Sequence, residues 1–76
     1  MMEQRVEISP RVCDGKPVIA GTRIPVTVIL EQLQEGVSWE DILEGYPELS
    51  RDDVRAAIQY ARAAIDHTEI VALSTR

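Results

Sequence analysis

The scarcity of cross-linking residues constrains the fold of this chain more than any other feature of its sequence. Cys13 has no second cysteine to pair with, and His67 is the single histidine, which leaves too few ligands for the usual zinc clusters. A chain of 76 residues buries only a modest core, and natural domains of this size usually add a disulfide, a metal or a partner. We therefore expect one small domain without metal or cofactor that forms a homodimer.

Hydropathy places the chain among folded proteins that do not enter a membrane. Hydrophobic residues make up 45% of the sequence, which is too many for a disordered chain. No apolar run approaches the roughly 20 residues that a membrane-spanning helix needs. The first residues are also not followed by the apolar core of a signal peptide. We expect a cytoplasmic protein.

Charge is distributed unevenly around the net value of -5. Residues 1–25 carry four basic and three acidic side chains, whereas residues 26–76 carry four arginines and ten acids. A nucleic-acid-binding face would therefore be a local patch and not the whole surface. The acidic second part of the chain also suits contact with a basic protein partner.

The N-terminal segment, residues 5–24, has the character of short β-strands. Residues 5–8 alternate between polar and apolar side chains, as in a half-buried strand. Residues 17–24 contain two β-rich arms on either side of a tight bend at Ala20 and Gly21, which predicts a small hairpin. So small a hairpin is not stable alone, so it must pack on the helices or on a second subunit.

Helical spacing of apolar residues predicts three helices, at about 25–35, 38–44 and 50–67. Pro25 suits a first helical turn, Gly36 suits a helix end, and Ser38 and Ser50 suit N-caps followed by acidic residues. The third helix has an apolar side made of Val54, Ala57, Ile58, Ala61 and Ile65. The sequence thus predicts a mainly α helix-turn-helix domain over residues 1–67, with a short N-terminal β segment and a tail at 68–76.

Residues 13–26 (CDGKPVIAGTRIPV) are similar to the opening motif of the bacterial "domain of unknown function 433" family. Later positions in residues 36–58 match the rest of the family pattern, so the resemblance covers roughly residues 5–67. It implies a homeodomain-like three-helix bundle and a predicted antitoxin of a type II toxin-antitoxin system. The partner that it implies is a PIN-like ribonuclease toxin encoded alongside.

Basic side chains suggest where operator DNA would be bound. On an ideal helix Arg51, Arg55, Gln59 and Arg62 fall within an arc of roughly 80°, and arginine and glutamine pair well with phosphates and base edges. The alternative is a solvated helix face. Asp52 and Asp53 lie in the first turn of the predicted third helix, next to Arg51, and their carboxylates would repel phosphate. On the β segment, Arg5, Arg11, Lys16 and Arg23 either reach the DNA backbone or are ordinary surface charge; we include Lys16 and Arg23 in the predicted DNA-binding set.

The tail suggests a segment that binds the toxin. Its apolar residues Ile70, Val71 and Leu73 would add to a partner protein, and Arg76 would approach the carboxylates of a metal-dependent nuclease. The alternative is a tail that packs on its own dimer.

We find no set of residues typical of a catalyst. The acid pairs at 40–41 and 52–53 are adjacent, so their side chains point apart on a helix, and Cys13 has no histidine close by in sequence. The sequence therefore predicts a binding protein with no small-molecule substrate. Two hypotheses remain: an antitoxin that binds a ribonuclease and operator DNA, or a protein-interaction module that never binds DNA.

Overall fold

Within the part of the chain that the structure describes, the fold consists of three α-helices and a very small sheet, in agreement with the predicted mainly α class. The computed structural model describes residues 5–66. Their elements are β1 (Val6–Glu7), the short 3-10 turn η1 (Cys13–Gly15), β2 (Val18–Ile19), α1 (Val26–Gln34), α2 (Trp39–Gly45) and α3 (Arg51–Asp66). The three helices lie where the apolar spacing predicts them. The tail at 68–76 lies outside the described residues.

The structure adds an earlier strand to the predicted hairpin within residues 17–24. β1 pairs with β2 in antiparallel register, with Val6 opposite Ile19. The bend at Ala20 and Gly21 is present, because the Thr22 backbone N–H donates to the Ile19 carbonyl at 3.0 Å and Gly21 has a φ of +82°. The arm after the bend pairs with the arm before it through an isolated bridge between Val18 and Pro25. Two backbone hydrogen bonds flank this bridge, from the Ile19 N–H to the Ile24 carbonyl at 3.0 Å and from the Val26 N–H to the Pro17 carbonyl at 2.9 Å. Residues 18–19 therefore pair with β1 on one side and with this arm on the other.

Helix caps fix the starts of α2 and α3. The Ser38 hydroxyl accepts a hydrogen bond from the Asp41 backbone N–H at 3.1 Å. At the start of α3 the capping is reciprocal: the Ser50 hydroxyl accepts from the Asp53 N–H at 3.3 Å, and the Asp53 carboxylate accepts from the Ser50 N–H at 3.0 Å. Both arrangements satisfy backbone donors that a helix start leaves unpaired.

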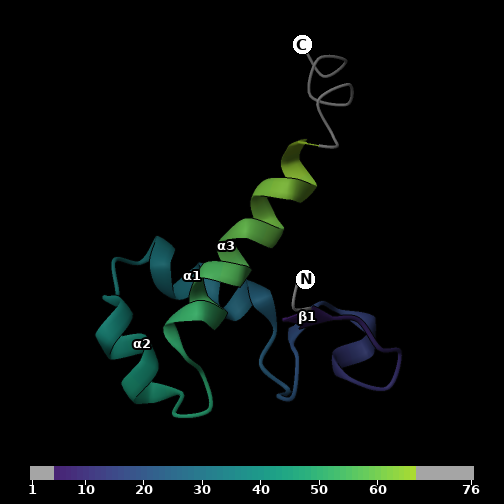
Figure 1. Cartoon of the computed structure of the whole chain (residues 1–76), viewed down its shortest axis with the longest axis horizontal. Helices are drawn as coiled ribbons and strands as arrows, with labels where there is room; N and C mark the ends of the chain where they lie inside the picture. The colour runs from purple at the N-terminus through teal and green to yellow at the C-terminus, as the bar shows by residue number, and fades with distance from the viewer. Residues whose placement is uncertain (1–4, 67–76) are drawn as a thin grey trace.

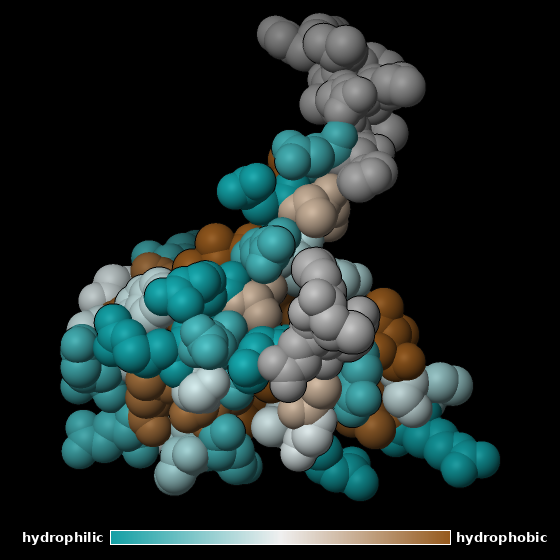
Figure 2. Space-filling model, in the orientation of Figure 1, coloured by the Kyte–Doolittle hydropathy of each residue, from teal (hydrophilic) through white to brown (hydrophobic). Residues whose placement is uncertain are grey.

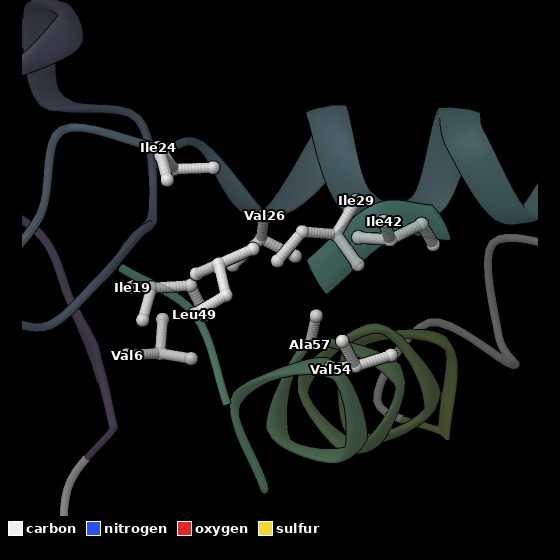
Figure 3. Close-up of a cluster of buried hydrophobic side chains, with 9 residues drawn as sticks. All are labelled: Val6, Ile19, Ile24, Val26, Ile29, Ile42, Leu49, Val54 and Ala57. Carbon is white, nitrogen blue, oxygen red and sulfur yellow. The ribbon is translucent and has the colours of Figure 1, made fainter. Parts of the chain in front are cut away.

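Every strand and helix contributes to one apolar core. Its buried members are Val6, Ile19, Ile24, Val26, Ile29, Ile42, Leu49, Val54 and Ala57. Figure 3 shows most of these side chains pointing toward a common centre between the β segment, α1, α2 and α3. The core therefore joins the β segment to the helices, although the two strands are only two residues long each.

The fully buried side chains of α3 all lie in its first half, and in the second half Tyr60 is partly buried against the same core. Val54 and Ala57 are fully buried, but Ile58 is 37% exposed and Ile65 is 68% exposed, so the predicted apolar side of this helix is only partly covered. In Figure 1 the C-terminal half of α3 extends away from the other elements. We call residues 58–66 the α3 stem. Among the described residues, no helix has the length and apolar character needed to cross a membrane.

Candidate interaction surfaces

The first two arginines predicted to bind DNA are held by acidic side chains of the same molecule. Arg55 lies 2.8 Å from the Asp52 carboxylate, one turn away on α3. Arg51 lies 3.5 Å from the Glu40 carboxylate, and its guanidinium carbon is 5.2 Å from the centroid of the Trp39 ring. Both arginines are exposed, as are their carboxylate partners, so these pairs are weak and exchangeable.

The other two residues of the predicted DNA-binding row lie on the α3 stem. Gln59 and Arg62 are exposed, and no hydrogen bond or ion pair joins either side chain to another residue in the part of the chain that the structure describes. The row is therefore divided. Its N-terminal half is engaged by α2 and by α3 itself, and its C-terminal half is open to solvent.

The acidic residues at the start of α3 are tied to the N-terminal segment. A guanidinium nitrogen of Arg5 donates to the Asp53 carboxylate at 3.1 Å, and another lies 3.7 Å from Asp52. Asp53 is 7% exposed, and a buried carboxylate needs partners that compensate its charge. Arg5 and the Ser50 backbone N–H are these partners. Arg5 thus has a structural role that the sequence pattern does not indicate.

The remaining basic residues of the predicted DNA-binding set are on the β segment. Lys16 follows η1 and Arg23 lies between the Gly21 bend and the core residue Ile24, and both side chains are exposed. Both therefore lie on a different part of the fold from the predicted DNA-binding arginines, which are on α3.

Exposed acidic residues follow one another along the second half of α1, its C-cap, α2 and the connector after α2. No lysine, arginine or histidine occurs between residues 24 and 50. The acidic residues of this stretch are all exposed: Glu31, Glu35, Glu40, Asp41, Glu44 and Glu48. Figure 2 shows hydrophilic side chains over the end of the molecule that carries α2, with apolar side chains between them. We call these six residues the acidic surface.

The sequence shows this concentration of negative charge as a stretch that contains no basic residue. The separate net charges of residues 1–25 and 26–76 do not locate it. Arg51 forms the one ion pair with the acidic surface that the described residues contain, through Glu40. Within residues 5–66 no group of three or more histidine, cysteine or acidic side chains is arranged to hold a metal ion. The other five carboxylates of the acidic surface are exposed to solvent, and no ion pair is described for them within these residues.

Comparison with known sequences decides the family. The profile of the family described as "Protein of unknown function (DUF433)" matches residues 6–61. The chain belongs to this family. Over 58 residues it is 40% identical to "Uncharacterized protein y4eO" of Sinorhizobium fredii, an alignment that covers 76% of this chain and 26% of that protein. The chain thus spans about a quarter of that relative's length.

A solved DUF433 structure has the same fold. It is the crystal structure of a DUF433 member protein from Anabaena variabilis, at 2.00 Å resolution, and it superposes with a TM-score of 0.76 at 32% identity. The similarity covers 86% of this chain and 64% of the crystallised chain. The DUF433 match ends at residue 61, within the α3 stem, so Ile65 lies beyond the part that the family profile describes. The predicted toxin-binding residues Ile70, Val71, Leu73 and Arg76 lie outside the described residues.

Proposed function

We propose that this DUF433 protein is a cytoplasmic, non-catalytic antitoxin that inhibits a PIN-like ribonuclease toxin by binding it through the acidic surface. The observation that supports this is the run of six exposed carboxylates on α1, α2 and the following connector, with no base between residues 24 and 50. The family resemblance supplies the class of partner. The homeodomain-like helix-turn-helix plan is part of the same proposal.

Electrostatics explains how such a surface would inhibit a ribonuclease. A protein that binds RNA must present cationic side chains to its phosphates, and these dominate its affinity for nucleic acid. An exposed row of carboxylates is complementary to such a surface and speeds encounter with it. The bound antitoxin would then occupy the site that the RNA backbone uses. The α3 arginines that are already paired with Asp52 and Glu40 would not oppose this contact.

The test is inhibition of RNA cleavage by the ribonuclease encoded beside this chain. Glu35→Lys combined with Glu44→Lys reverses two exposed charges of the acidic surface, neither of which holds a described hydrogen bond. We expect this variant to inhibit at least about tenfold more weakly than the parent chain, since charge reversal at a complementary interface adds repulsion to the loss of attraction. Glu7→Lys on β1 is the matched control, because Glu7 is exposed but lies outside the acidic surface. Equal inhibition by the double variant and the control would refute the proposal.

Binding of operator DNA is the second candidate function. It is favoured by the exposed Gln59 and Arg62, which share one flank of α3 with Arg51 and Arg55 and have no partner among the described residues. It is opposed by Asp52 and by the ion pairs of Arg51 and Arg55.

Fluorescence anisotropy with a duplex from the chain's own promoter, titrated with salt, tests it. Specific binding should weaken steeply as salt rises, and Arg62→Ala should weaken it further. If the chain bound promoter and unrelated duplexes equally weakly, specific DNA binding would be rejected. The chain would then be a protein-interaction module that does not act on DNA.

A further inference from the structure

The first two residues of α2 offer an aromatic ring and a carboxylate, and one guanidinium group contacts both. The guanidinium carbon of Arg51 lies 5.2 Å from the centroid of the Trp39 ring, and one of its nitrogens lies 3.5 Å from a carboxylate oxygen of Glu40. A planar guanidinium group can stack on an aromatic face and pair with a carboxylate at the same time. Trp39 and Glu40 together therefore form a receptor for a guanidinium group, which we call the guanidinium receptor.

The ring of this receptor is held by the fold, whereas the arginine that occupies it is held weakly. Trp39 is partly buried and packs against the apolar core. The side chains of Arg51 and Glu40 are 58% and 76% exposed. An ion pair this open to solvent contributes little, so breaking it costs little. A guanidinium group from another molecule can thus displace Arg51 without any change in the core.

The surroundings of the receptor favour a cation from another molecule. Glu40 belongs to the acidic surface, and no basic residue occurs between residues 24 and 50. Arg51, whose charge is paired, does not repel a cation that approaches elsewhere on this surface, but it does occupy the receptor. Tryptophan is also among the side chains that most often dominate the binding energy of a protein interface.

We propose that Trp39 and Glu40 bind an arginine side chain of the partner protein, and that this arginine displaces Arg51. The identity of the partner as an RNA-binding protein rests on the proposed function, whereas the receptor is defined by contacts within the free chain. Arginine fits both, because it is the side chain that pairs bidentately with phosphates and carboxylates. A lysine would pair with Glu40 but would lack the planar group that stacks on the ring.

Fluorescence titration of the full chain with short peptides tests the chemistry of the receptor. Trp39 is the only tryptophan in the sequence, so its emission reports on the receptor itself. The probes are tetra-arginine and tetra-lysine, which carry equal charge, at about 0.15 M salt to screen long-range attraction. Tetra-arginine should change the emission and bind at least about threefold more tightly than tetra-lysine. Equal affinity for the two peptides would overturn the proposal, because attraction to negative charge alone would then explain binding.

Arg51→Ala tests whether Arg51 occupies the receptor. This variant leaves the receptor empty, so its affinity for tetra-arginine should rise at least about threefold. Arg55→Ala is the matched control, because it removes the same charge about one turn further along α3, where the guanidinium pairs with Asp52. Its affinity should rise by less than about 1.5-fold at the same salt concentration. Equal gains in the two variants would show that Arg51 acts only through its charge, and the proposal would be wrong.

Glu40→Gln tests the carboxylate of the receptor. It should weaken the binding of tetra-arginine more than Glu44→Gln does, although both variants remove one negative charge from the acidic surface. Circular dichroism of the four variants establishes that they fold. Equal losses in Glu40→Gln and Glu44→Gln would contradict a specific contact with Glu40.

The ribonuclease assay with the Glu35→Lys and Glu44→Lys double variant tests the proposed function separately, since the peptide titrations contain no ribonuclease. If the peptides behave as expected but the double variant inhibits as well as its control, the receptor stands and the ribonuclease is not its partner. If the double variant loses inhibition but Arg51→Ala and Arg55→Ala gain equally, the acidic surface binds the ribonuclease and the receptor is wrong.

Discussion

Asp53 is the residue through which the N-terminal segment stabilises α3, and its removal should be costly. In Asp53→Ala the Ser50 backbone N–H loses its acceptor at 3.0 Å, and the Arg5 guanidinium loses its acceptor at 3.1 Å. Loss of a helix cap costs about 1 kcal/mol. The contact with Arg5 contributes about 1 kcal/mol more, because a charge-assisted hydrogen bond is discounted where solvent reaches the guanidinium.

The expected loss is therefore about 2 kcal/mol in the free energy of unfolding, a large share of the stability of a domain this small. Urea unfolding followed by far-UV circular dichroism, at a fixed protein concentration, measures it. Asp52→Ala is the matched control, because Asp52 is 58% exposed and its ion pairs with Arg55 and Arg5 are worth little in water. We expect that control to cost under about 1 kcal/mol.

The double variant Arg5→Met with Asp53→Ala separates the cap from the ion pair. If Arg5 acts through Asp53, the two changes together should cost about 1 kcal/mol less than the sum of the single changes. Costs for Asp53→Ala and Asp52→Ala that agree within about 0.5 kcal/mol would refute the reasoning, because buried and exposed carboxylates would then be equivalent.

Three further changes test the fold by the same unfolding measurement. Ile29→Ala should cost about 3 kcal/mol, because it opens a cavity in the core, whereas Ile58→Ala on the partly exposed stem should cost less than about half of that; equal costs would contradict the observed burial. Gly21→Ala should cost about 1 kcal/mol from its positive φ alone, while Gly45→Ala, at a glycine without that conformation, should be close to neutral; a neutral Gly21→Ala would mean that the bend is not left-handed there. Ser38→Ala should cost about 1 kcal/mol through the lost cap of α2, and an unchanged midpoint would show that this helix start needs no side-chain acceptor.

The helices could be predicted from sequence because their ends are encoded by local chemistry. Ser38 and Ser50 each precede acidic residues at capping distance, and the hydrogen bonds that these patterns predict are present. Gly36 has a φ of +84°, the conformation that a helix end requires and that side chains disfavour. These signals span only a few residues, so no knowledge of the tertiary fold is needed to interpret them.

The strand pairing could not be predicted in the same way. A two-residue strand such as β2 has too few side chains for alternation to select its partner. The pairing with β1 occurs together with a contact between residues 48 apart in sequence, in which Arg5 next to β1 donates to Asp53 on α3. Periodicity carries no information about such a contact.

The candidate surfaces were partly predictable for a related reason. Helical geometry places Arg51, Arg55 and Arg62 on one flank of α3, but it does not specify how α2 packs against that flank. The contacts of Arg51 with Glu40 and Trp39 depend on that packing. Likewise, spacing puts Ile58 and Ile65 on the core-facing side of the helix but does not reveal that these side chains are 37% and 68% exposed.

The arrangement of charge makes the protein-binding and DNA-binding proposals experimentally separable. The six carboxylates of the acidic surface lie on α1, α2 and their following connector, whereas the exposed Arg62 lies on the stem of α3. Reversing Glu35 and Glu44 removes negative charge from a chain of net charge -5, so it should weaken binding to a cationic protein while leaving or improving binding to DNA. Arg62→Ala acts in the opposite sense on DNA and should leave toxin inhibition unchanged. If both variants impaired both activities alike, the two surfaces would act as one, and the assignment of separate roles to α2 and α3 would be wrong.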